Sequence, residues 1–129
     1  MSLSKFIIIA ICGGVLTASS GTIVSPNYPG AYPNNVECIW TIQMPVGARI
    51  TLNWQSIDVE TQDTCNYDYV QLRNGNSTTS PLVGKYCGKS PPATFISTGN
   101  SLYIKFVSDS SSTGNGFQLS YVLGKSRRF

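Results

Sequence analysis

The feature that most constrains the fold is a series of short segments in which apolar and polar residues alternate. Alternation with a period of two is typical of strands that bury one face. The clearest of these segments are Cys38–Met44, 49–57, 67–73, Leu82–Tyr86, 95–98, Ser101–Val107 and Phe117–Leu123. Gly, Pro and Asn residues separate them, and no helical periodicity appears. About eight or nine strands joined by frequent turns predict an all-β fold, an antiparallel β-sandwich of jelly-roll type.

Charge and composition exclude several functions. The 129 residues include nine basic and six acidic residues and no histidine. The absence of histidine removes the Ser-His-Asp and Cys-His mechanisms and the commonest zinc ligand. Three basic residues, Lys125, Arg127 and Arg128, account for the net charge of +3, so the body of the chain is neutral. We therefore expect no enzymatic activity and no nucleic-acid partner.

Four cysteines, at positions 12, 38, 65 and 87, allow three disulfide pairings, and none forms a Cys-x-x-Cys motif. An even number of cysteines in a chain rich in Ser, Thr and Asn indicates an oxidising compartment. The triplet Asn76-Ser77-Thr78 is an acceptor for N-glycosylation at Asn76. Both features predict a secreted, extracellular protein.

The N-terminus has two interpretations. Lys5, the apolar run Phe6–Ile11 and the small residues that follow resemble a secretory signal peptide, and the run is too short to span a membrane. Cleavage near residues 18–21 would remove Cys12. Alternatively, Cys12 begins the folded domain. We divide the chain into a leader (1–11), a domain (12–123) and a solvated basic tail (124–129), with no membrane span.

Acidic residues concentrate in the stretch Asp58–Leu72, which holds four of the six. Asp58, Glu60 and Asp63 fall between two predicted strands, and Asp68 follows Cys65 closely. Carboxylate oxygens gathered in a chain so poor in charge favour a cation that prefers oxygen ligands.

An ordered set of motifs resembles the CUB domain, an extracellular β-sandwich family. The motifs are Cys12-Gly-Gly-x-Leu16, Gly21-x-Ile-x-Ser-Pro-Asn-Tyr-Pro29, Tyr32-Pro-Asn-Asn35, Cys38-x-Trp40, Cys65-x-Tyr-Asp68, Tyr86-Cys-Gly88, Ser108-Asp109 and Gly116-Phe117. They cover about residues 12–123. The resemblance implies two disulfides, which join the first cysteine to the second and the third to the fourth.

The resemblance also implies a calcium site at one end of the sandwich. Its ligands would be the carboxylates of Glu60, Asp68 and Asp109 and the backbone carbonyl of Ser111. Tyr32 would support the site and contact the ligand. Through the ion, Glu60 and Asp109 would bind Lys or Arg side chains of an extracellular protein partner.

Other interpretations remain open at the level of sequence. Glu60 and Asp68 could be solvated loop acids, and Asp109 could form an Asx turn. Many calcium-binding members carry Asn where this chain has Ser112, so the chain departs from the family pattern at that position. The alternative functions are a secreted glycan-binding CUB protein and an accessory module of a larger extracellular protease. Trp40 and Trp54 are expected in the core.

Overall fold

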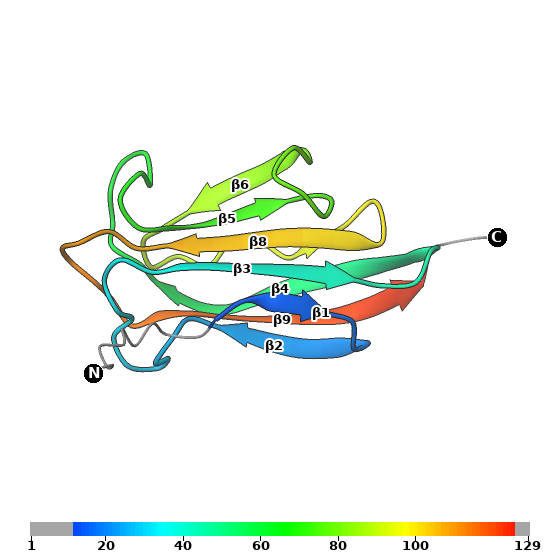
Figure 1. Ribbon diagram of the computed structural model, residues 1–129, viewed down its shortest axis with the longest axis horizontal. Helices are drawn as coiled ribbons and strands as arrows, with labels where there is room; N and C mark the ends of the chain where they lie inside the picture. The colour runs from blue at the N-terminus through cyan, green and yellow to red at the C-terminus, as the bar shows by residue number, and fades with distance from the viewer. Residues whose placement is uncertain (1–11, 126–129) are drawn as a thin grey trace, which may run out of the picture.

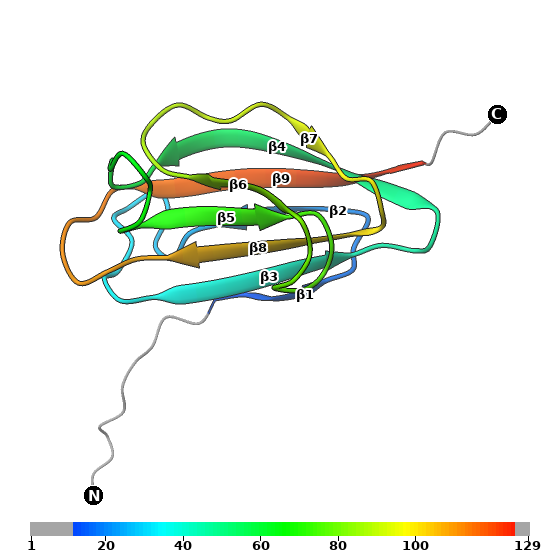
Figure 2. The ribbon, with the colours of Figure 1, turned by 90° about the horizontal axis from the view of Figure 1, so that it is seen from above.

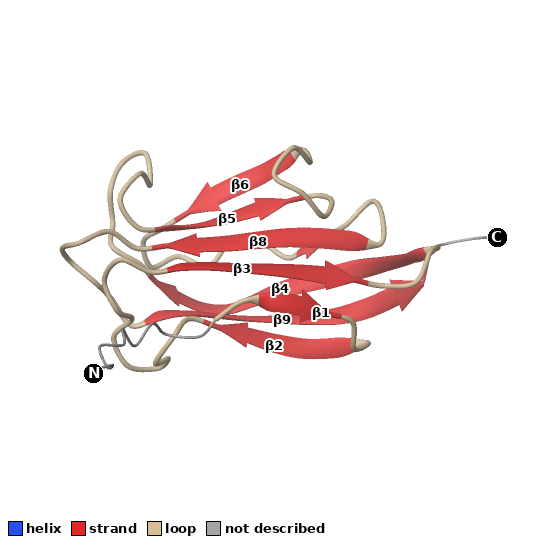
Figure 3. Ribbon diagram, in the orientation of Figure 1, coloured by secondary structure: helices blue, strands red, loops and turns tan. Residues whose placement is uncertain are grey.

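The chain folds into two β-sheets packed face to face, as seen in a computed structural model that describes residues 12–125 (Figure 1). Every regular element in this range is a strand (Figure 3). The strands are β1 (Gly14–Leu16), β2 (Ser20–Val24), β3 (Glu37–Gln43), β4 (Ala48–Asp58), β5 (Tyr69–Arg73), β6 (Leu82–Tyr86), β7 (Phe95–Ile96), β8 (Ser101–Val107) and β9 (Gly116–Lys125). The predicted all-β sandwich is confirmed. No helix that could cross a membrane is found between residues 12 and 125.

The two sheets have the strand orders β1-β3-β8-β5-β6 and β2-β9-β4-β7. All neighbouring strands are antiparallel except β1, which runs parallel to β3 with Gly14 opposite Trp40. The sequence analysis named neither β1 nor β2 as a strand, and the parallel pairing of β1 departs from the expected purely antiparallel sandwich. A strand of three residues is too short to show alternation. The disulfide between Cys12 and Cys38 holds this segment against β3.

Alternation places the core where the sequence indicated. Phe106 of β8 and Phe117 of β9 are fully buried, and their rings pack 5.3 Å apart between the sheets. Trp40 packs edge-on against Phe117 and is 7% exposed. Trp54 is half-buried and packs against Tyr86. A bulge between Trp54 and Ser56 shifts the alternation of β4 by one residue, so that Ile57 faces the core.

Two disulfides staple the described chain, Cys12–Cys38 and Cys65–Cys87, which confirms the pairing that the resemblance implied. The predicted leader, residues 1–11, lies outside the described residues. Of the predicted basic tail, Gly124 and Lys125 belong to β9 and pair with Arg49 and Ala48, so the last strand continues two residues beyond the predicted boundary; Arg127 and Arg128 lie outside the described residues.

The loops that bear the acidic residues lie at one end of the sandwich. β4 ends, β5 begins and β8 ends at the same side of the molecule, at the left in Figures 1 and 2. The loop between β2 and β3 also reaches this end. We call it the acidic end, and it is bounded by residues 25–36, 59–68, 87–94 and 108–115.

Candidate metal centre

Three carboxylates from separate parts of the chain meet at the acidic end. Glu60 lies two residues after β4, Asp68 directly precedes β5, and Asp109 lies two residues after β8. One carboxylate oxygen from each lies within 4.8 Å of the others. The structure therefore brings together the three acidic ligands that the resemblance implied.

Asp68 is fully buried and is held by two hydrogen bonds. The Tyr32 hydroxyl donates to Asp68 Oδ2 (2.6 Å), and the Asp109 N–H donates to Asp68 Oδ1 (2.8 Å). The same alternation that places Val70 and Leu72 in the core turns Asp68 inward. Asp68 is consequently no solvated loop acid, which excludes that interpretation for this residue.

Tyr32 links the Asp68 carboxylate and the Glu60 backbone to the core. Its hydroxyl donates to Asp68 and accepts a hydrogen bond from the Glu60 N–H (3.1 Å), while its ring packs edge-on against Phe106. The sequence analysis gave Tyr32 two roles, support of the carboxylates and contact with a ligand. Because Tyr32 is only 1% exposed, it has almost no surface to offer a partner. Its contacts serve the supporting role.

Glu60 contributes an oxygen that lacks a partner. Its Oε1 atom is buried and is the only such side-chain oxygen or nitrogen without a hydrogen bond within the described chain. Native proteins pair nearly all buried polar atoms, so an orphan of this kind calls for an explanation. A cation at the centre of the three carboxylates would supply one.

The loop that carries Asp109 is fixed from two sides. The Asn35 N–H donates to the Asp109 carbonyl (2.9 Å), and the Tyr32 N–H donates to the Gly114 carbonyl (3.1 Å). At the end of the loop, the Asn115 N–H donates to Asp58 Oδ2 (3.2 Å). The sequence analysis placed Asp58 only among the acidic residues between two predicted strands. Its role in positioning this loop depends on a contact across 57 residues, which no local pattern reveals.

Ser111 lies in the same loop and contacts Asp109. Its N–H and hydroxyl both donate to Asp109 Oδ1, at 3.1 Å and 3.3 Å. The first contact closes the Asx turn that the sequence analysis had considered as an alternative. The turn engages only one carboxylate oxygen, so Asp109 can form it and still offer Oδ2 to a metal. Ligation by the Ser111 carbonyl remains a prediction.

The electrostatics of the site favour a bound cation. The only salt bridge in residues 12–125 joins Lys105 to Glu37, so no described cation neutralises the three carboxylates. Burial raises the pKa of Asp68, although hydrogen bonds from Tyr32 and Asp109 oppose the rise. Loss of hydration raises the pKa of Glu60, and the charges of Asp68 and Asp109 raise it further. Burial and the hydrogen bond to Asp68 also raise the pKa of Tyr32, which keeps its hydroxyl protonated as a donor.

The donor set fits calcium. Ca²⁺ binds six to eight oxygens at about 2.3–2.6 Å, so two of its ligands lie at most about 5 Å apart. The separations within 4.8 Å among Glu60, Asp68 and Asp109 are compatible with that limit. The site offers neither histidine nor thiolate, the ligands that softer metals prefer. Asp63 is exposed and does not belong to the cluster.

Comparison with known proteins defines the class to which this fold and site belong. The sequence profile described as CUB domain matches residues 12–121. The chain therefore belongs to the CUB domain family.

Individual relatives agree with this assignment. The chain is 46% identical over 112 residues to bone morphogenetic protein 1 homolog of Strongylocentrotus purpuratus, covering 87% of this chain and 18% of that protein. It is 41% identical over 106 residues to human procollagen C-endopeptidase enhancer 2, covering 82% and 25%. The crystal structure of the MASP-1 CUB2 domain bound to Ca²⁺ superposes with a TM-score of 0.78 at 35% identity, covering 87% of this chain and 99% of that domain. The chain thus spans a quarter or less of these two full-length relatives.

Proposed function

We propose that this chain is a secreted, calcium-dependent recognition module that binds Lys or Arg side chains of an extracellular protein partner. The observation that carries the proposal is the meeting of Glu60, Asp68 and Asp109, with one buried Glu60 oxygen unpaired and no described cation beside them. The solved MASP-1 CUB2 domain, which is 35% identical, is bound to Ca²⁺ and supports the choice of metal.

The three carboxylates would divide the work according to their burial. Asp68 is enclosed by Tyr32 and the Asp109 backbone, so it can serve only as an inner ligand of the ion. Glu60 and Asp109 are half-exposed. Each could give one oxygen to calcium and present the other to a partner. In Asp109 that other oxygen is Oδ1, which also accepts from Ser111. Calcium would hold these oxygens in place for the ammonium or guanidinium group of a partner, a charge-assisted contact that neutral side chains cannot make.

Tyr32 would position this arrangement without touching the partner. Its hydroxyl bridges Asp68 and the Glu60 backbone, and its ring is anchored on Phe106. Asp58 would act similarly, because it anchors the end of the loop that carries Asp109 and Ser111. The Ser111 carbonyl would complete the protein ligands.

The module would act as a non-catalytic part of a larger extracellular protein. The relatives are several times longer than the matched region, and they include a protein named as an enhancer of an endopeptidase. Asn76 and Thr78 are both exposed in the loop between β5 and β6, which lies at the end opposite the metal centre. A glycan on Asn76 would therefore leave the acidic end accessible.

Calorimetric titration of the chain with CaCl₂ tests the metal site. We expect one binding event in the wild type, its loss in Asp109→Asn, and its retention in the control Asp63→Asn. Asp109→Asn keeps an oxygen for the Asx turn but removes the charge, so the fold is preserved. Absence of binding by the wild type, or equal binding by Asp109→Asn, would contradict the proposal.

The docking step needs its own probe. We expect biotinylated hexalysine to be retained on the immobilised chain in CaCl₂ and released by EDTA, whereas hexaglutamate is not retained. If hexalysine stays bound in EDTA, its retention is due to simple charge attraction, and the proposed calcium-dependent binding of Lys or Arg is refuted. Retention of a heparin fragment in EDTA would instead favour the glycan-binding alternative.

A further inference from the structure

The four outer edges of the two sheets differ in how they are protected. Exposed strand edges invite pairing with other chains, and proteins usually shorten, charge or bulge them. β7 has two residues and β1 has three, while β6 carries Lys85 and pairs with β5 through an irregular register. β2 is five residues long and contains no charged residue, no proline and no bulge. Among the edges in the described chain, β2 alone lacks all of these protections.

The register of β2 on β9 shows which backbone groups face outward. The Ser25 N–H donates to the Phe117 carbonyl (3.2 Å), and the Leu123 N–H donates to the Ser19 carbonyl (2.7 Å). Hydrogen bonding in an antiparallel pair alternates from residue to residue. The odd-numbered residues of β2 therefore bond to β9. The N–H and C=O groups of Ser20, Thr22 and Val24 point away from the sheet, where an added strand would meet them.

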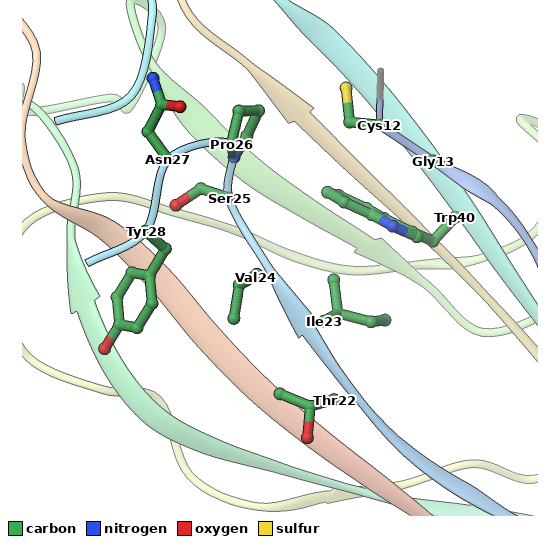
Figure 4. Close-up of a pocket in the computed structure, with 10 residues that line it drawn as sticks. All are labelled: Cys12, Gly13, Thr22, Ile23, Val24, Ser25, Pro26, Asn27, Tyr28 and Trp40. Atoms are coloured by element: carbon green, nitrogen blue, oxygen red, sulfur yellow. The ribbon is translucent and has the colours of Figure 1, made fainter. Parts of the chain in front are cut away.

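A pocket of about 370 Å³ lies directly beside this edge (Figure 4). It lies between β2 and the segment Cys12–Gly13, and it is lined by Thr22 and Val24 of the edge and by Ile23 and Trp40 of the core. None of its lining residues is charged. The site therefore combines a row of backbone donors and acceptors with an adjoining hollow that suits an uncharged side chain.

We propose that β2 is a docking edge, which an extended, uncharged segment of a protein partner joins as an antiparallel strand. Every second side chain of the added strand would turn inward, and one would enter the pocket against Ile23 and Trp40. Main-chain hydrogen bonds supply affinity in strand addition, and pockets for alternate side chains supply specificity. The partner's chemistry follows from these two parts: an extended backbone for the edge and an uncharged side chain for the neutral pocket.

A second copy of this chain fits the edge less well. Two copies joined through β2 would share a strand of only five residues, about 17 Å long. That contact is small beside the roughly 1,200–2,000 Å² buried in specific protein interfaces. A peptide segment makes the same hydrogen bonds and can in addition place a side chain in the pocket. The inward side chain of a second copy's β2, Ile23, is already buried in that copy's own core.

Selection of phage-displayed random dodecapeptides on the immobilised full chain tests the proposal. All steps are carried out in EDTA, so the outcome is independent of the metal centre. We expect enrichment of peptides that carry few charges and are rich in the β-branched and aromatic residues that favour an extended strand. Their binding should weaken about tenfold or more in Thr22→Pro, which removes an outward N–H without breaking a bond to β9. The matched control Thr22→Val keeps that N–H and should bind within about twofold of the wild type.

N-methylation of the selected peptide gives a readout that does not depend on a variant's folding. Two peptides are compared, one N-methylated at the odd-numbered residues and one at the even-numbered residues. One of them should lose binding and the other should keep it, because only one edge of the added strand faces β2. Three results would overturn the proposal: equal loss of binding by both methylated peptides, peptide binding that Thr22→Pro does not weaken, or no enrichment of peptides in the selection.

Two further outcomes would assign the edge to a different occupant and also overturn it. The first is a dimer in sedimentation experiments that Thr22→Pro dissociates. The second is that the Thr22 and Val24 amides are protected from hydrogen exchange in the chain alone and that deletion of residues 1–11 removes this protection.

Discussion

The two ends of the sandwich hold their loops together by different means. At the end opposite the acidic residues, neutral groups satisfy one another: Met44 and Asn100 exchange two hydrogen bonds of 2.8 Å, and the Ser97 hydroxyl accepts from the Ile50 N–H and donates to the Gly99 carbonyl. The acidic end has one neutral contact of this kind, because the Ser108 hydroxyl accepts from the Val36 N–H and donates to the Pro33 carbonyl, but it also holds three carboxylates and the unpaired Glu60 oxygen.

The difference indicates that one end is complete without a ligand and the other is not. A buried hydroxyl that both donates and accepts leaves no uncompensated charge. Buried carboxylates accept hydrogen bonds but cannot cancel one another's charge, and their mutual repulsion opposes folding unless a cation is present. The acidic end therefore lowers the free energy of unfolding of the calcium-free chain, and binding of a cation would raise it again.

The largest expected effect on stability is that of calcium binding at the acidic end. At a free concentration of 100 times Kd, a ligand bound only by the folded state adds about 2.7 kcal/mol to the free energy of unfolding. For a domain of this size that corresponds to a rise in Tm on the order of 10 °C. Differential scanning calorimetry in CaCl₂ and in EDTA would measure it. An equal rise in Asp109→Asn would show that calcium acts elsewhere.

Tyr32→Phe should have the next largest effect. The change removes the hydroxyl that donates to the buried Asp68 Oδ2 and accepts from the Glu60 N–H. Loss of a hydrogen bond to a charged buried group costs about 1.5–3 kcal/mol. Urea denaturation would show the loss in EDTA, together with weaker calcium binding by calorimetry. Unchanged calcium affinity would mean that Tyr32 supports the fold but not the metal centre.

Ser97→Ala is the matched change at the neutral end. Ser97 is fully buried and makes two neutral hydrogen bonds. We expect a loss of about 1 kcal/mol in urea denaturation. The loss should be the same in CaCl₂ and in EDTA, because no charge is involved. A calcium-dependent loss would show that the two ends are coupled, and the contrast between them would fail.

The smallest effect concerns pH in the calcium-free chain. The pKa values of Glu60 and Asp68 are raised in the folded state. The folded form then binds more protons than the unfolded form between the ordinary carboxyl pKa near 4 and the raised values. Its free energy of unfolding should therefore fall as the pH rises through that window. Urea denaturation in EDTA should show a shallower dependence for Glu60→Gln, and an identical dependence would contradict this assignment.

Much of the fold followed from local pattern, and the exceptions have identifiable causes. Ser101–Val107 and Leu82–Tyr86 were predicted to the residue, because alternation and flanking turns define them. β1 was missed, since three residues cannot display a period and their partner is set by the Cys12–Cys38 bridge. The inward turn of Ile57 depends on the bulge after Trp54, which the sequence does not signal.

The candidate site was only partly accessible from sequence. The acidic stretch showed where carboxylates were concentrated but not which of them meet, and the family resemblance supplied that choice. Asp58, Glu60 and Asp63 lie within six positions, yet they differ completely in role: one anchors a loop, one joins the cluster and one is exposed. These roles follow from where β4 ends and how the chain turns afterwards, which tertiary contacts decide. The outward backbone groups of β2 likewise depend on the register with β9.

The origin of the three carboxylates in different layers has a mechanical consequence. Glu60 follows a strand of the four-stranded sheet, whereas Asp68 and Asp109 adjoin strands of the five-stranded sheet. An ion held by all three would cross-link the two sheets at one point. A pulling force on a bound partner would then be distributed over β4, β5 and β8, and no single strand would be separated from its neighbours on its own.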